Sequence, residues 1–172
     1  MRPPITVALA VLAAVSAGGG SSIETPHLTA TVSASSAAVS AGGRVSLFVD
    51  ITPKPKMHVY APQQKELIPI SLTIEPARAF RAAAPVFPAP EKYFFAPLNE
   101  TQLVYSRPFR IVLPLTLASA AALRSAGHAP GSTIAIAGKL RYQACDDAIC
   151  YLPKDVPVSW TLTVKATGAR VQ

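Results

Sequence analysis

The amino-acid sequence predicts an all-β fold, and more narrowly an antiparallel β-sandwich of the immunoglobulin-like type. Two runs place apolar residues at every second position, which is the period of a strand with one buried face. The chain also contains 17 prolines in 172 residues, a density that disfavours long helices. About seven short strands separated by turn residues are typical of a sandwich. The alternating residues are Val45, Leu47, Val49 and Ile51 in the first run, and Val158, Trp160, Leu162 and Val164 in the second.

The predicted strands extend over most of the chain. Ala41-Gly42-Gly43 has the composition of a hairpin turn between the first two strands. Ser119 to Gly127 is the one segment that we expect to be helical, and Trp160 should lie in the core. The predicted strands are residues 28–34, 44–52, 57–60, 70–74, 109–117, 133–143 and 156–164.

The first 17 residues have the features of a signal peptide. Arg2 supplies a positive charge, Ile5 to Ala17 is apolar, and Val15-Ser16-Ala17 fits the small-x-small cleavage pattern. The apolar run, about 13 residues, is shorter than a membrane-spanning helix requires. We therefore expect cleavage after Ala17 and a periplasmic or secreted mature protein, in a compartment where disulfides persist. An uncleaved signal anchor is the alternative.

One domain, residues 28–165, is expected between two less regular ends. Residues 18–27 are rich in glycine and serine at their start and predict a flexible leader, which includes His27. Residues 166–172 form the predicted tail. The formal charge of +7 comes from scattered basic residues, which argues against nucleic-acid binding. We expect a monomer.

The only two cysteines, Cys145 and Cys150, are separated by four residues. In the chain-entropy model, closing a loop of about 6 residues stabilises a protein by roughly 2 kcal/mol, against roughly 4 for a loop of about 65. A pair this close is therefore a weak structural crosslink, but it suits reversible exchange, which needs an attacking and a resolving thiol. Asp146 and Asp147 lie between the cysteines and should raise a thiol pKa, which favours activation only when a partner docks. The alternatives are an inert loop disulfide and a metal site.

The segment around the cysteines resembles a known family. Lys139 to Leu162, KLRYQACDDAICYLPKDVPVSWTL, is similar to the signature of the N-terminal periplasmic domain of the thiol:disulfide interchange protein DsbD. KMHVYAP (Lys56 to Pro62) and PAPEKYFFAPLNETQLVYSRPFRIVLPL (Pro88 to Leu115) extend the resemblance upstream. Together these segments place the similarity over residues 28–164.

The resemblance implies an immunoglobulin-like fold with a redox-active dithiol. Such a domain takes electrons from a thioredoxin-like donor and passes them to periplasmic disulfide proteins. By this resemblance Cys150 attacks the substrate disulfide and Cys145 resolves the mixed disulfide. The membrane and thioredoxin-like domains that follow in full-length members are not in this sequence, so a separate membrane partner is an expectation.

The resemblance also implies an aromatic cap over the cysteines. Its candidates are consecutive aromatic residues with an acidic neighbour, and we favour Phe95 among Tyr93, Phe94, Phe95 and Glu91. A run of three aromatics between Pro90 and Pro97 is not expected inside a regular strand, so it should cover something or fill the core. Tyr60 and His58 match positions that lie against the active site. By residue type alone, His58 is expected to be a surface histidine rather than a catalytic base.

These observations predict a thiol:disulfide oxidoreductase that works through Cys145 and Cys150 without a cofactor. The second hypothesis is a secreted, non-catalytic binding module whose disulfide stiffens a recognition loop. The third is a protein that holds a soft metal ion such as Cu(I) with the thiols and Met57 or His58.

Overall fold

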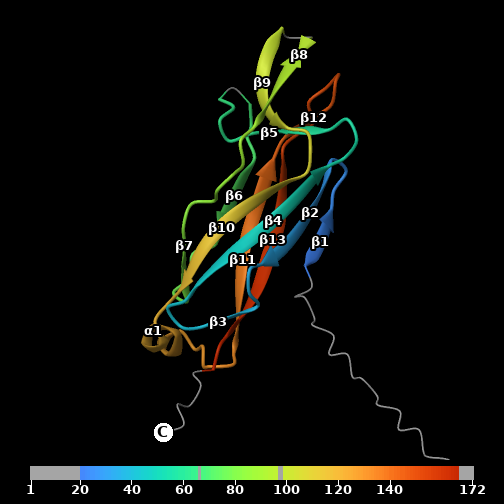
Figure 1. Ribbon diagram of the computed structural model, residues 1–172. Coiled ribbons are helices and arrows are strands. Elements are labelled where there is room, and N and C mark those ends of the chain that lie inside the picture. The colour runs from blue at the N-terminus through green and yellow to red at the C-terminus, as the bar shows by residue number, and fades with distance from the viewer. Residues whose placement is uncertain (1–19, 66, 97–98, 167–172) are drawn as a thin grey trace, which may run out of the picture.

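A computed structural model describes residues 20–65, 67–96 and 99–166 of the chain. The predicted signal peptide, residues 1–17, lies outside these ranges, as does the tail from residue 167 onward. Within them the chain forms two sheets packed face to face and a smaller sheet at one end (Figure 1). The prediction of an all-β, immunoglobulin-like sandwich is confirmed.

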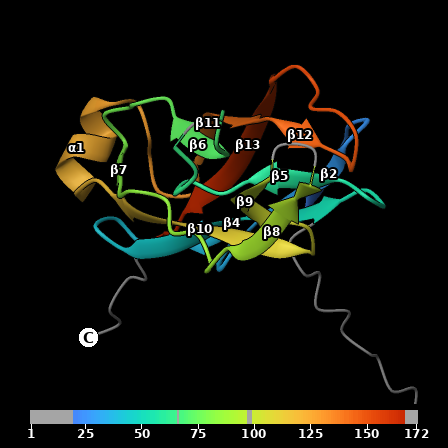
Figure 2. The same ribbon diagram turned by 90° about the horizontal axis from the view of Figure 1, so that it is seen from above.

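The first sheet has five strands, and its neighbouring strands are all antiparallel. In Figure 2, which looks from above, the central strands of this sheet lie along the lower side of the molecule and the strands of the second sheet lie above them. The strand order is β1 (Ser21–Glu24), β2 (Leu28–Ala34), β4 (Arg44–Pro53), β10 (Phe109–Leu117) and β7 (Phe80–Ala82).

The second sheet has four strands, of which only β3 and β13 pair in parallel. A short helix, α1 (Ala120–Ser125), lies at the end of the sandwich remote from the smaller sheet (Figure 1). The Ser119 hydroxyl caps its first turn by accepting from Ala122 N at 3.3 Å. The strand order is β3 (Ala38–Val39), β13 (Lys154–Val164), β11 (Thr133–Tyr142) and β6 (Ser71–Ile74).

The smaller third sheet extends beyond the sandwich and carries the cysteines. Its long arm is the hairpin of β8 and β9, seen at the top of Figure 1. The strand order is β12 (Ala144–Cys145), β5 (His58–Tyr60), β9 (Glu100–Tyr105) and β8 (Glu91–Phe95).

The core lies between the two larger sheets, where the alternating apolar residues predicted from the sequence are buried. Trp160 on β13 is only 5% exposed, and its indole Nε1 donates to the carbonyl of Phe48 on β4 at 3.2 Å. This bond joins the two sheets, so Trp160 fills the core without leaving its polar atom unpaired. The buried positions of the two alternating strands are Val45, Leu47, Val49, Ile51, Val158, Trp160, Leu162 and Val164.

Two expectations for the N-terminal part of the domain differ from the structure. Residues 21–24 of the expected flexible leader form β1, which pairs with β2 and is fixed by a Glu24–Lys54 ion pair at 2.6 Å. The expected first two strands, β2 and β4, do pair antiparallel, but the turn at residues 41–43 joins β4 to β3, which lies between them in the chain and pairs with the second sheet. Gly42 still supplies the left-handed turn, with φ 71°.

None of the helices in the described ranges has the length and apolar character needed to cross a membrane.

Candidate functional site

The two cysteines form a disulfide where β12 ends, at the junction of the sandwich and the third sheet. Their Cα atoms are 4.1 Å apart. β12 is held from one side by β5, where Cys145 lies directly opposite His58. The chain returns through Tyr151, whose N–H donates to Ala144 O at 2.9 Å. Cys145 therefore sits in a paired strand, whereas Cys150 closes the loop that follows it.

Asp146 shapes the loop between the cysteines. Its Oδ1 accepts from the backbone N–H groups of Ala148 and Ile149, both at 2.8 Å, and its Oδ2 accepts from the Tyr151 hydroxyl at 2.8 Å. These hydrogen bonds lower the pKa of Asp146, and the two from the backbone of Ile149 and Ala148 have the largest effect. The carboxylate thus fixes the loop conformation in the manner of an Asx turn.

The two sulfur-bearing residues differ sharply in exposure. Cys145 is 0% exposed and packs in a small cluster with Tyr60 and Val104, whereas Cys150 is exposed. An incoming thiolate or disulfide from another protein therefore meets Cys150 first. Tight burial leaves Cys145 accessible only to its neighbour in the loop.

Tyr60 lies against both sulfur atoms. Its hydroxyl is 2.8 Å from Cys145 Sγ and 3.2 Å from Cys150 Sγ. Because disulfide sulfurs carry no proton, the hydroxyl is the donor in this state. Burial raises the pKa of Tyr60, so the phenol keeps its proton and can donate to whichever sulfur becomes a thiolate.

The aromatic run is part of a regular strand, contrary to the expectation from the flanking prolines. β8 pairs with β9 from Glu91 to Phe95, and Pro90 precedes the strand rather than interrupting it. Strand alternation places Tyr93 and Phe95 on one face, while Phe94 faces the other way and is 59% exposed.

Tyr93 is the aromatic residue that joins this hairpin to the cysteine loop. Its ring packs against the cluster of Tyr60, Val104 and Cys145, and its hydroxyl donates to Asp147 Oδ1 at 2.9 Å. Phe95, the favoured cap, is buried, and its ring centroid lies 6.5 Å from that of Tyr93. The hairpin thus contacts the loop through Tyr93, with Phe95 beside it on the same face.

The carboxylate of Glu91 binds residues at the base of the hairpin. It accepts from the Ser106 hydroxyl at 2.7 Å and from Arg107 Nε at 3.1 Å. The bond from Arg107 is the main reason why the pKa of Glu91 is lowered. Glu91 therefore anchors the hairpin base, and its hydrogen bonds go to this anchor rather than to the cysteine loop.

His58, which the family resemblance placed against the active site, is buried opposite Cys145, and a second histidine, His27, is buried beside Tyr151. His58 is 3% exposed, its ring lies 4.6 Å from that of Tyr93, and its Nε2 has no hydrogen-bond partner within the described ranges. His27 is also buried, 4.5 Å from the Tyr151 ring, and its Nδ1 is likewise unpaired there. The expectation that His58 lies on the surface is wrong. Its position two residues before Tyr60, and so on the same strand face, was the available signal.

Burial is the main cause of an altered pKa at both histidines. It lowers the pKa of His58, against the opposing charges of Asp147 and Asp146. Burial likewise lowers the pKa of His27, and the positive charge of Lys154 lowers it further. Both imidazoles are therefore neutral at pH 7.

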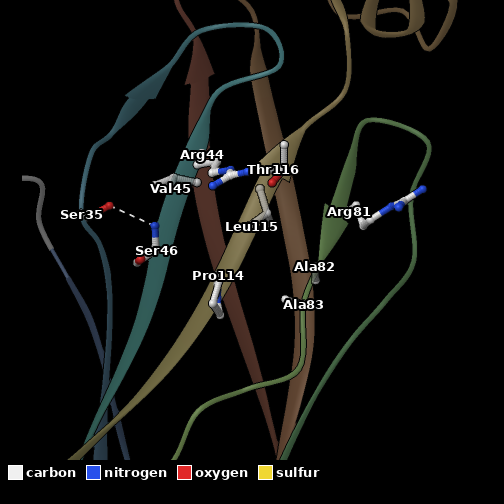
Figure 3. A pocket seen from close by; sticks show the side chains of 10 residues that line it. All are labelled: Ser35, Arg44, Val45, Ser46, Arg81, Ala82, Ala83, Pro114, Leu115 and Thr116. Atoms are coloured by element: carbon white, nitrogen blue, oxygen red, sulfur yellow. Dashed lines mark hydrogen bonds between the residues drawn. The ribbon is translucent and has the colours of Figure 1, made fainter.

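A hollow on the outer side of the sandwich is remote from the cysteines. It lies over β4, β10 and β7, near the end that carries α1 (Figure 3). Its charged lining residues are Arg44 and Arg81, and it contains no thiol, histidine or carboxylate. Across the part of the chain that the structure describes, no group of three or more His, Cys, Asp or Glu residues is placed to hold a metal ion.

The fold of this domain is similar to those of solved protein domains. Six solved chains match its structure. The N-terminal periplasmic domain of ScsB from Proteus mirabilis superposes with a TM-score of 0.52 at 15% identity, over 83% of this chain and 50% of that one. This chain thus spans half the length of that structure. The reduced N-terminal domain of Neisseria meningitidis DsbD gives a TM-score of 0.44 at 19% identity, over 77% of this chain and 85% of that one.

No curated protein matches the sequence. The family model described as "Thiol:disulfide interchange protein DsbD, N-terminal" matches residues 25–159, a range that includes the disulfide, Tyr60 and the β8–β9 hairpin. The chain therefore belongs to the family of DsbD N-terminal domains.

Proposed function

We propose that this domain is a thiol:disulfide oxidoreductase that relays reducing equivalents through Cys145 and Cys150. The observation that carries the proposal is the asymmetry of the pair. One sulfur-bearing residue is exposed to a partner, the other is buried, and a single tyrosine hydroxyl lies within 3.2 Å of both sulfurs. A disulfide that only stiffened a loop would need neither the exposure nor the shared donor.

The exchange has two steps. In the first, the Cys150 thiolate attacks a substrate disulfide, so that a Cys150–substrate bond forms and the other substrate sulfur leaves with the electron pair and takes up a proton. In the second, the Cys145 thiolate attacks Cys150 Sγ and expels the remaining substrate thiolate. Two electrons and two protons pass to the substrate, and the Cys145–Cys150 disulfide remains. Tyr60 donates to the sulfur that carries negative charge in each step.

Family membership supports a proposal for the partners and the compartment. We expect a thioredoxin-like protein to reduce the domain and periplasmic disulfide proteins to oxidise it. We expect the domain to work in the periplasm. The reaction needs no bound cofactor, because the cysteines carry both electrons.

The reduction potential of the purified domain tests the proposal against the alternative of a structural disulfide. We expect a value between about −180 and −270 mV, the range of known exchange proteins. The measurement is a titration in glutathione or dithiothreitol buffers, read by alkylation of free thiols. A potential well below about −300 mV is typical of structural disulfides and would identify a binding module instead.

Tyr93 is proposed to be the aromatic residue that shields the pair. Tyr93→Ala removes the ring that packs on the Cys145 cluster, and it removes the hydrogen bond from the Tyr93 hydroxyl to Asp147. The reduced cysteines should therefore be alkylated several-fold faster. Phe94→Ala is the matched control, because Phe94 lies on the same strand with its side chain on the opposite face. Equal alkylation rates in the two variants would remove Tyr93 as the shield and leave Phe95 to be tested.

A further inference from the structure

The resolving step requires a proton to leave a sulfur that water does not reach. Cys145 is 0% exposed, and burial together with nearby carboxylates raises the pKa of a thiol. A docked partner covers Cys150 and excludes water further. The Cys145 thiol therefore needs a proton acceptor built into the protein, a requirement that arises from the proposed exchange reaction.

Three of the polar groups around Cys145 are poor acceptors. The Tyr60 hydroxyl is protonated and acts as a donor to sulfur. The Asp146 carboxylate already accepts three hydrogen bonds, which lower its pKa and its basicity. The Asp147 carboxylate accepts from the Tyr93 hydroxyl and belongs to an exposed residue of the loop. None of these three groups is therefore a good acceptor for the Cys145 proton.

His58 differs from these groups in having a free basic nitrogen. It is directly opposite Cys145 in the antiparallel β5–β12 pair, and opposite residues on such strands place their Cβ atoms about 4.5–5.5 Å apart on one face. The residue is only 3% exposed, and its Nε2 is buried with no partner among the described residues. An unpaired polar atom in such a place carries a cost in stability, which a catalytic role would explain.

We propose that His58 is the general base of the resolving step, accepting the proton of the Cys145 thiol as that sulfur attacks Cys150. The bond between Cys145 and Cys150 forms, and the bond between Cys150 and the partner breaks with its electron pair on the partner sulfur. His58 then gives the proton to that leaving thiolate or to solvent. In the opposite direction of flow, the imidazolium returns the proton to Cys145.

The surroundings of His58 set the pH range in which it can act. The titratable groups that face it are Tyr60 on its own strand, Tyr93 on β8, Cys145 on β12, and the two loop aspartates. The tyrosines are neutral, and the aspartates favour a charged imidazole. An acceptor must be neutral, so the resolving rate should fall only as the pH drops through the His58 pKa, below about 6.5.

Stopped-flow reaction of the reduced domain with 5,5′-dithiobis(2-nitrobenzoate) separates the two steps. Attack by Cys150 releases one thionitrobenzoate, and closure by Cys145 releases the second. His58→Gln should slow the second release by about 100-fold at pH 7, the lower end of general-base effects, and leave the first within about twofold. The matched control is His27→Gln, which alters another buried histidine with an unpaired nitrogen and should change neither phase.

Two results would overturn the proposal: an unchanged second phase in His58→Gln, or an equal slowing of both phases. If that variant does not fold, the wild-type pH profile decides. A second-phase rate that climbs tenfold per pH unit up to about 8.5, the ordinary thiol pKa, would show that no base assists. Both phases can be measured whatever the reduction potential of the pair, so failure here is distinct from failure of the proposed function.

Discussion

Replacing Cys150 with serine should abolish exchange with a thioredoxin-like partner, whereas replacing Cys145 should trap the partner as a mixed disulfide. The reason is the difference in burial, since only Cys150 is exposed to an incoming disulfide and Cys145 is enclosed by Tyr60 and Val104. Without Cys150 no first bond forms. Without Cys145 the bond forms but nothing inside the domain resolves it.

The measurement is non-reducing electrophoresis after each reduced variant is mixed with an oxidised thioredoxin-like protein. A band of summed mass, sensitive to dithiothreitol, should appear with Cys145→Ser and be absent with Cys150→Ser. The two variants serve as controls for each other, because each removes one thiol from the same loop. The reverse pattern would exchange the two roles and would also contradict the assignment of His58 to the resolving step.

Trp160→Ala should lower the free energy of unfolding by about 3–5 kcal/mol, the usual cost of removing a large aromatic side chain from a core. The substitution empties the space between the sheets and leaves the Phe48 carbonyl without its donor. Since domains are typically stable by only about 5–15 kcal/mol, this change should bring the protein close to its unfolding threshold.

Urea denaturation of the oxidised protein, followed by far-ultraviolet circular dichroism, measures the effect. Leu152→Ala is the control, because Leu152 is 86% exposed and a surface substitution should change stability by no more than about 0.5 kcal/mol. A loss below about 1 kcal/mol in Trp160→Ala would mean that the two sheets do not depend on this residue.

The sequence predicted the long sandwich strands β2, β4, β10, β11 and β13, because each has one buried and one more solvated face, but it did not predict the short strands β3 and β7. β4 and β13 alternate almost without exception. β1 was missed because it has no continuously buried face and its residues are mostly exposed. β8 was missed because aromatic residues occupy both of its faces, so no alternation marks it as a strand.

In the candidate site, some features could be predicted from a single segment of the sequence, whereas others depend on contacts between distant segments. The spacing of Cys145 and Cys150 is local and favours exchange chemistry, but it left an inert disulfide and a metal site open until the resemblance of the surrounding segment was considered. The burial of Cys145 depends on the pairing of β12 with β5, and the burial of His58 on its stacking against Tyr93. These contacts join segments 35 or more positions apart in the chain, and no property of a single segment indicates them.

The pairing of β8 with β9 has a consequence for how sequences of this family should be compared. Tyr93 pairs with Gln102 and Phe94 with Thr101, and a shift of one position would turn every side chain to the other face. An alignment displaced by a single residue could therefore assign the shielding role proposed for Tyr93 to Phe94, which is 59% exposed. Relatives with aromatic runs of different length are better matched through the partner strand, by finding the counterpart of Gln102, than through the aromatic residues themselves.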